Sequence, residues 1–181
     1  LFSTSLRVHS VDAFSGNLVW STDEPRGWSA LRTSDREEFF TAIDHDDNLI
    51  APAAGDGIVV AALQVPFRNL RNANFQGITI TRTIPERRLF AFDEETGEPL
   101  WDHQPSPLWD GFGGEFSERM KVCGPPVVIG SRVLVPCYRL QGRIDLHLAC
   151  YELETGSLLW SAALVSGQRE LNMFGRHELE F

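Results

Sequence analysis

Residues 89–101 read LFAFDEETGEPLW, and the same pattern occurs twice more, as VHSVDAFSGNLVW at 8–20 and as LACYELETGSLLW at 148–160. The three segments align without gaps. Each is an alternating apolar run followed by an acid, two variable residues, Ser or Thr, Gly, three residues and Trp. Such regular recurrence indicates that the chain is built from repeats of one structural unit.

The repeated segment predicts a β-hairpin, because alternation is typical of a half-buried strand and a polar stretch with glycine near its end is typical of a turn. The acid and the hydroxyl are expected to accept hydrogen bonds from turn amides, and the glycine to supply a positive φ. The tryptophan is expected to bury its ring against the next unit, with its indole N–H on a carbonyl. These structural positions are Asp12, Gly16 and Trp20; Asp93, Gly97 and Trp101; and Glu152, Gly156 and Trp160.

A second shared pattern lies upstream of the second and third hairpins. Residues 51–61 (APAAGDGIVVA) and 124–135 (GPPVVIGSRVLV) both read as strand, tight turn, strand. Each pair, together with the hairpin that follows it, makes four antiparallel strands, which is the blade of a β-propeller. We therefore expect an all-β fold, a partial propeller of about two full blades plus part of a third.

The unit resembles the repeat of the pyrroloquinoline-quinone (PQQ) enzyme-like propeller family, which has the pattern L-x-A-x-D-x-x-T-G-x-x-x-W. Residues 90–101, FAFDEETGEPLW, are a close match, and with the upstream strands the resemblance covers about two-thirds of the chain. It implies the fold class of the quinoprotein-like superfamily and an extracytoplasmic location, in the periplasm or cell envelope. It implies no particular activity.

The spacing of the tryptophans sets the expected boundaries within a single partial propeller domain, 1–181. Trp20 and Trp101 are 81 residues apart and Trp101 and Trp160 are 59 apart, longer than a usual blade, so the excess is expected in loops. The expected parts are a half blade at 1–22, a blade at 48–103 with an insertion at 64–87, a blade at 122–163, and a connector to a further blade at 164–181.

An open ring of two to three blades exposes apolar faces and strand edges. Two sources of the remaining blades are open. One is the same parent chain, which we favour, and the other is a second copy that closes the ring by self-association.

Charge and hydropathy exclude some partners. The net charge of −9 and the pI of about 5.0 repel phosphate backbones, so no nucleic-acid partner is expected. No apolar run approaches the roughly 18 residues of a membrane-spanning helix, so no transmembrane segment is expected. Cys123, Cys137 and Cys150 form no C-x-x-C pair and therefore no zinc framework. Cys137 and Cys150 fall in expected strands, where buried free thiols are favoured over a disulfide.

One stretch is locally basic in an otherwise acidic chain. Residues 64–88 contain a single acid, Glu86. A basic loop on a propeller is a candidate contact for an acidic partner or ligand. The alternative is that its arginines are solvated or pair with acids such as Asp44, Asp46 and Asp47. The candidate partner-binding residues are Arg68, Arg71, Arg82, Arg87 and Arg88.

Residues 44–48 (DHDDN) place two aspartates and an asparagine at alternate positions, like the start of a calcium loop. Leu49 and Gly55 stand where that loop needs glycine and a closing glutamate, so a polar turn is favoured and no metal site is assigned. Trp28 and Trp109 lie outside the repeat register. They are candidates for contact with a partner or sugar, although core packing is favoured for both.

No catalytic constellation is recognisable, so no catalytic residue is assigned and enzymatic activity is not predicted. The favoured hypothesis is a non-enzymatic repeat scaffold that presents loops to a protein partner or ligand, similar in this respect to the propeller lipoprotein of the outer-membrane barrel-assembly machinery. The alternative is a PQQ-dependent dehydrogenase that oxidises alcohols or sugars, with PQQ and calcium in the central channel. No cofactor is expected from this segment under the first hypothesis. The expected partners are a protein or the remaining blades.

Overall fold

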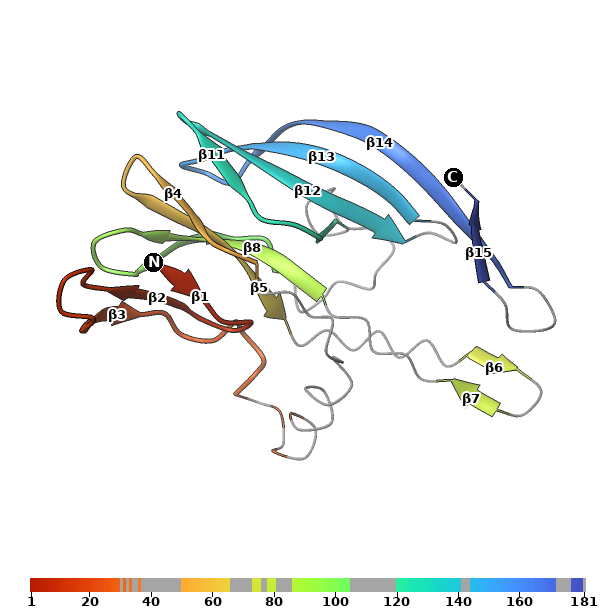
Figure 1. Ribbon diagram of the computed structural model, residues 1–181, viewed down its shortest axis with the longest axis horizontal. Coiled ribbons are helices and arrows are strands. Elements are labelled where there is room, and N and C mark those ends of the chain that lie inside the picture. The colour runs from red at the N-terminus through yellow and green to blue at the C-terminus, as the bar shows by residue number, and fades with distance from the viewer. Residues whose placement is uncertain are drawn as a thin grey trace.

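The computed structural model describes residues 1–29, 31, 33, 36, 50–65, 73–75, 78–80, 86–104, 120–140, 144–171 and 177–180. Three antiparallel sheets lie side by side in sequence order, with the first at one end of the row and the third at the other (Figure 1). All the elements with bounds below are strands, and among the residues just given only Thr33 and Arg36 are in helical conformation. The expectation of an all-β partial propeller is confirmed.

The first blade contains three strands, β1 (Phe2–Ser3), β2 (Val8–Val11) and β3 (Leu18–Ser21), in the order β1-β2-β3. The sequence predicted only the β2–β3 hairpin here. The seven residues before β2 nevertheless hold one more short strand, because a tight turn closed by the hydrogen bond from Thr4 N to Arg7 O (2.8 Å) folds β1 back onto β2.

The second blade has the four expected strands in the order β4-β5-β8-β9. Their bounds are β4 (Ala53–Gly55), β5 (Ile58–Val65), β8 (Glu86–Asp93) and β9 (Pro99–Asp102). The β5–β8 ladder extends to the pair Val65 and Glu86, so the insertion is shorter than the expected 64–87. Between these strands β6 (Ala73–Phe75) and β7 (Ile78–Ile80) pair as a small hairpin.

The third blade is centred on β12 (Arg132–Leu140) and β13 (Ile144–Glu152). Its inner strand is interrupted, because β10 (Lys121–Val122) and β11 (Val127–Ile129) both pair with β12. The outer strand β14 (Leu158–Leu171) runs past residue 163, the expected end of the blade, and pairs with β15 (His177–Glu180). Much of the expected connector at 164–181 is therefore strand.

The hydrophobic core lies between the sheets in two layers. The layer between the first and second blades consists of Val8, Trp20, Val59, Ala61, Leu63, Val65, Phe90 and Phe92. The larger layer between the second and third blades includes Val60, Ala62, Leu89, Ala91, Met120, Val122, Val133, Val135, Cys137, Ala149, Tyr151 and Leu153. The inner strands β4 and β11 pack closely, since a Cβ added to Gly55 on β4 would lie 2.7 Å from the Val128 side chain on β11.

The three cysteines are free thiols. Cys137 and Cys150 are buried in the third blade, as expected, and Cys123 is exposed. Although β12 and β13 are neighbours, Cys137 pairs with His147 and Cys150 pairs with Leu134, so the two thiols are not opposite each other. No described helix is long and apolar enough to cross a membrane.

Candidate functional site

The repeated turns are built as the sequence predicts. In the first, Asp12 Oδ1 accepts hydrogen bonds from the backbone N–H groups of Phe14 (3.1 Å) and Ser15 (2.7 Å) and from the Ser15 hydroxyl (2.8 Å). Asp93 makes the equivalent bonds in the second turn. Hydrogen bonds from the amides of Ser15 and Thr96 are the main causes that lower the pKa of Asp12 and Asp93, respectively.

The third turn keeps part of this arrangement. The Thr155 hydroxyl donates to Glu152 Oε2 (2.7 Å), and the backbone bond from Gly156 N to Glu152 O (2.9 Å) is retained. Within the described residues the side chain of Glu152, which is longer than that of the aspartate in the other two turns, accepts no hydrogen bond from a turn amide. The glycine of each turn has a positive φ of 69–75°.

Trp20 joins the first blade to the turn of the second. Its Nε1 donates to the carbonyl of Glu94 at 3.0 Å, and its ring lies over Gly97. A Cβ added to Gly97 would come within 2.6 Å of the indole. The glycine is therefore needed twice, for its positive φ and for the absence of a side chain under the ring.

Trp101 repeats this contact between the second and third blades. Its Nε1 donates to Leu153 O at 2.9 Å, and a Cβ on Gly156 would lie 2.6 Å from its ring. Glu94 and Leu153 hold the same place in their turns, one residue after the acid. We call this combination of indole, turn glycine and turn carbonyl the docking contact.

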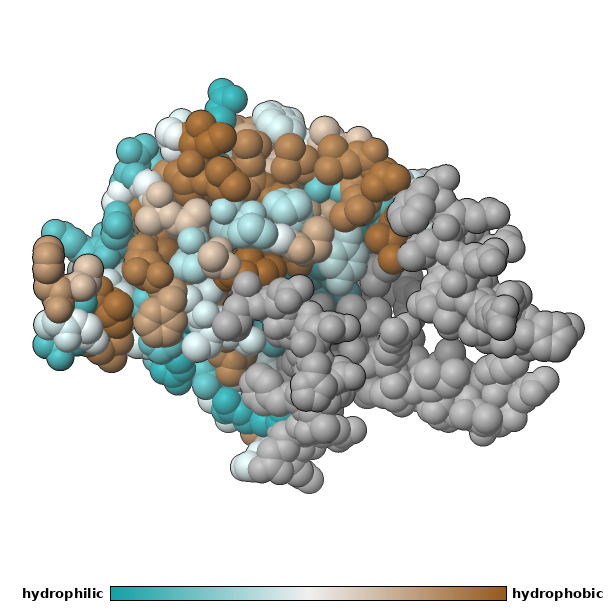
Figure 2. Space-filling model, in the orientation of Figure 1, coloured by the Kyte–Doolittle hydropathy of each residue, from teal (hydrophilic) through white to brown (hydrophobic). Residues whose placement is uncertain are grey.

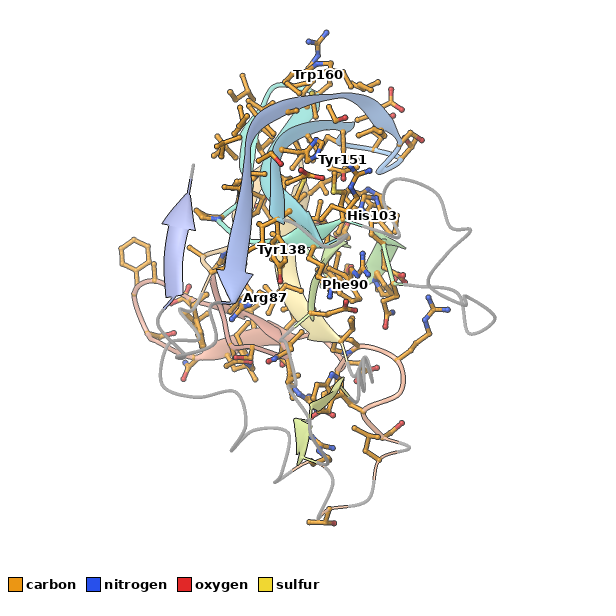
Figure 3. The ribbon with its side chains drawn as sticks, turned by 90° about the vertical axis from the view of Figure 1, so that its right-hand side faces the viewer. Arg87, Phe90, His103, Tyr138, Tyr151 and Trp160 are labelled. Carbon is orange, nitrogen blue, oxygen red and sulfur yellow. The ribbon has the colours of Figure 1, made fainter. Side chains whose placement is uncertain are left out.

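The series of docking contacts is open at both ends. Trp160 occupies the third tryptophan position but is 42% exposed. At the other end, no described residue lies within 4 Å of a Cβ added to Gly16, so none of the described indoles lies on its turn. Figure 3 shows Trp160 on the outer side of the third blade, away from His103 and Tyr151, which lie between the second and third blades.

His103 was not identified from the sequence, yet it adds to the second docking contact. Its ring stacks on Trp101 at 5.1 Å between centroids and packs against Tyr151 at 4.8 Å. Its Nε2 lies 2.8 Å from Gly156 O, so this nitrogen carries the proton and donates. Burial is the main cause that lowers the pKa of His103, and the bond to Gly156 opposes it.

A buried charged cluster joins the second and third blades at the start of β8. The carboxylate of Glu86 pairs with Arg88 Nη2 at 3.6 Å and with the Lys121 ammonium of β10. Arg88 Nη1 also donates to the carbonyl of Met120. Burial, with the charge of Glu86 as a smaller cause, raises the pKa of the adjacent Tyr138 to about 12.

Two of the five arginines in the predicted basic loop lie inside the second blade. Arg87 and Arg88 lie within β8 and are 5% and 1% exposed, so the expectation that they lie on an exposed loop is wrong. The reason is that Glu86, the single acid of the segment, pairs with Arg88 inside the protein. Arg68, Arg71 and Arg82 lie outside the described residues.

Trp28 is a core residue, which confirms the favoured expectation of core packing. It is fully buried, and its Nε1 donates to Gln64 O at 2.8 Å on β5, so it fixes the chain after β3 against the second blade. Trp109 and the alternating acids at 44–48 lie outside the described residues. Among the residues the structure describes, no three His, Cys, Asp or Glu side chains are grouped as a metal-ligand set.

Repeated blades joined by docking contacts define the class of the protein, a β-propeller section of PQQ-like repeats. The chain belongs to the family of outer membrane protein assembly factor BamB, whose family model matches residues 5–177. The expected resemblance is thus confirmed. No curated protein sequence matches the chain at a significant level.

Two solved structures show the same fold. The quinohemoprotein alcohol dehydrogenase of Comamonas testosteroni is similar over 91% of this chain, with 20% identity and a TM-score of 0.53. The quinohemoprotein alcohol dehydrogenase ADHIIG of Pseudomonas putida HK5 is similar over 91% of the chain, with 20% identity and a TM-score of 0.51. The chain spans 19% of the length of each. At this identity the likeness concerns the fold alone.

We assign no ligand for PQQ or calcium among the described residues. A calcium ion takes six to eight oxygen ligands. Three acids in the described part of the chain have other roles, since Asp12 and Asp93 accept turn hydrogen bonds and Glu86 pairs with two cations. No step of a redox reaction is therefore assigned to these residues.

Proposed function

We propose that the chain is the blade section of a non-enzymatic propeller scaffold that binds a protein partner through the long segments between its strands. The observation that carries the proposal is the family match over residues 5–177. The matched family is described as outer membrane protein assembly factor BamB. The similarity to alcohol dehydrogenases supports only the fold, because the identity is 20%.

The roles of the repeat side chains and the position of the added segments support the same proposal. The repeat acids, glycines and the two docked tryptophans serve the turns and the contacts between blades. The segments at 66–85 and 105–119 are additions to the repeat, and loops on a rigid scaffold are the usual place for recognition residues. We further propose an extracytoplasmic setting in the cell envelope and a partner that takes part in outer-membrane protein assembly.

A cross-linking experiment tests the partner. A photo-reactive amino acid is placed at Gln76, and envelope fractions from cells that make the protein are analysed for cross-linked assembly components. The triple change Arg68→Ser, Arg71→Ser and Arg82→Ser is expected to abolish the cross-link while the circular dichroism spectrum is unchanged. Arg132→Ser, an exposed arginine of the third blade, is the matched control. Equal cross-linking by the triple variant and the control would contradict a role for the basic segment.

The alternative function, a PQQ-dependent dehydrogenase, is tested separately. The purified protein is titrated with PQQ in the presence of calcium and assayed with an artificial electron acceptor and primary alcohols or sugars. Our proposal predicts no saturable absorbance change and no turnover. Stoichiometric PQQ binding with dye reduction would contradict it.

A further inference from the structure

A pocket lies between the first and second blades, at their outer strands β3 and β9. One wall is the end of β3 and the chain that follows it, residues 21–26, and the other wall is formed by residues of β8, the turn and β9. The volume is about 440 Å³, within the range of roughly 300–1,000 Å³ that is usual for ligand sites. Both walls belong to neighbouring blades that the docking contact of Trp20 holds together, so the pocket is a feature of the described fold itself.

Aromatic side chains give the pocket an apolar part. Phe90 and Phe92 of β8 have nearly parallel rings, with 6.3 Å between their centroids and 5° between their planes. Both line the pocket but are only 6% and 4% exposed, so they offer a small apolar surface below the rim. A ligand that fills the pocket therefore needs an apolar or planar part beside its polar group.

Carboxylates form the polar part of the pocket. The charged residues among its described lining are Asp23, Glu24, Glu98, Asp102 and Arg26. Glu24 pairs with two arginines, Arg7 and Arg36. Within the described part of the chain, Asp23 and Glu98 have no ion-pair partner. Four carboxylates against one cation make the pocket attractive to a positively charged group.

The rim already holds one guanidinium. Arg26 Nη2 lies 3.1 Å from Asp102 Oδ1, and the Arg26 side chain is 66% exposed. Exposed ion pairs of this kind are weak, so a cation from outside competes with Arg26 for Asp102. Arginine fits the pocket better than lysine, because a guanidinium is planar, packs on aromatic rings and binds carboxylates through two nitrogens.

We propose that this pocket binds the side chain of an arginine from an extended segment of a partner protein. The guanidinium lies on the carboxylates of the rim, and the rest of the side chain faces Phe90 and Phe92. The net charge of −9 attracts such a segment. Figure 2 shows hydrophobic side chains gathered over the third blade, whereas hydrophilic side chains are frequent at the ends of the first two blades. Such binding is independent of the proposed function, which concerns the segments at 66–85 and 105–119.

The experiment is an NMR titration of the ¹⁵N-labelled full chain at low ionic strength. The probe is acetyl-arginine amide, and its matched control is acetyl-citrulline amide, which has nearly the same shape but no charge. We expect saturable shifts at the backbone amides of Thr22, Gly97 and Glu98, with a dissociation constant that is roughly millimolar. The citrulline probe is expected to bind at least roughly tenfold more weakly.

Substitutions in the rim are expected to change the affinity in opposite directions. The double change Asp23→Asn and Glu98→Gln should weaken binding of the arginine probe at least roughly tenfold. Arg26→Gln should strengthen it roughly threefold, because it removes the cation that competes for Asp102. Glu95→Gln, an exposed acid of the same turn that does not line the pocket, is the control and should bind like the wild type.

Three outcomes would overturn the proposal. The first is the absence of saturable shifts at these amides, and the second is equal binding of the arginine and citrulline probes. The third is an equal effect of Glu95→Gln and the double change, which would show attraction to surface acids in general. Cross-linking from Gln76 reports on the long segments, so its result and the result of this titration can be told apart.

Discussion

The indole of Trp101 lies so close to the backbone of Gly156 that a β-carbon there would come within 2.6 Å of the ring, while its Nε1 donates to Leu153 O at 2.9 Å. The residues are 55 positions apart and belong to neighbouring blades. A tryptophan side chain of one sheet thus packs on the backbone of the next sheet. This contact requires a residue without a Cβ at position 156.

Gly156→Ala is expected to destabilise the fold by about 3 kcal/mol, from the left-handed backbone of a residue with a Cβ and from the clash with the ring. Gly57→Ala is the matched control. Gly57 has a φ of +77°, but no described residue lies within 4 Å of a Cβ added there, so only the backbone cost of about 1 kcal/mol is expected. Urea unfolding measures both. Equal losses for the two variants would show that the ring does not press on Gly156.

Stability should depend on pH through His103. Its pKa in the folded state is below the value of 6.5 for a free histidine, because the ring is buried. The unfolded chain therefore takes up the proton first, and the stabilisation by the neutral ring is present above about pH 6.5 and is lost as the pH falls towards the folded pKa.

His103→Phe keeps an aromatic ring beside Trp101 and Tyr151 but cannot titrate. The difference in unfolding free energy between wild type and this variant is expected to shift in favour of the variant between pH 7.5 and pH 5. A difference that stays constant over this range would contradict the burial of His103 as a neutral ring.

Glu86→Gln tests the charged cluster between β8 and β10. The change keeps the shape but removes the carboxylate to which Arg88 and Lys121 pair, in a site where the Glu86 and Arg88 side chains are 1% exposed. A loss of about 3 kcal/mol is expected, because removal of one partner leaves buried charge uncompensated. Glu98→Gln, an exposed carboxylate, should change little. Similar small effects of both changes would indicate that the cluster is hydrated.

The hairpins, the docked tryptophans and the buried Trp28 could be predicted from the sequence because each depends on local chemistry. Alternation predicts a strand, and glycine after Ser or Thr predicts the turn. Three tryptophans at one register imply a common partner on the next unit. The structure adds that this partner is the turn glycine itself, as Trp20 on Gly97 shows.

The parts that could not be predicted depend on pairing between distant segments. The sequence suggested a basic loop for Arg87 and Arg88 because it does not show that Glu86 pairs with Arg88 inside the protein. The second cation of Glu86, Lys121, comes from the next blade. The role of His103 could not be predicted because histidine does not recur at this position in the other two repeats. Thr22 and Ala162 stand two residues after the other two tryptophans.

The thiols are expected to differ in reactivity. Cys123 is exposed, whereas Cys137 and Cys150 are buried, and burial raises the pKa of Cys137 to about 12. Because the thiolate is the reactive form, a disulfide reagent at pH 8 should modify Cys123 first and reach the other two only after unfolding. Cys123→Ser should remove the fast reaction. Fast modification of two or more thiols in the folded protein would contradict the packing of the third blade.

The central claim is that tryptophan side chains join successive blades, and hydrogen exchange of the indole N–H groups by NMR tests it most directly. We expect slow exchange at Trp20 and Trp101, whose Nε1 groups donate at 3.0 and 2.9 Å, and fast exchange at Trp160, which is 42% exposed. Exchange at Trp101 as fast as at Trp160 in the folded protein would contradict the account.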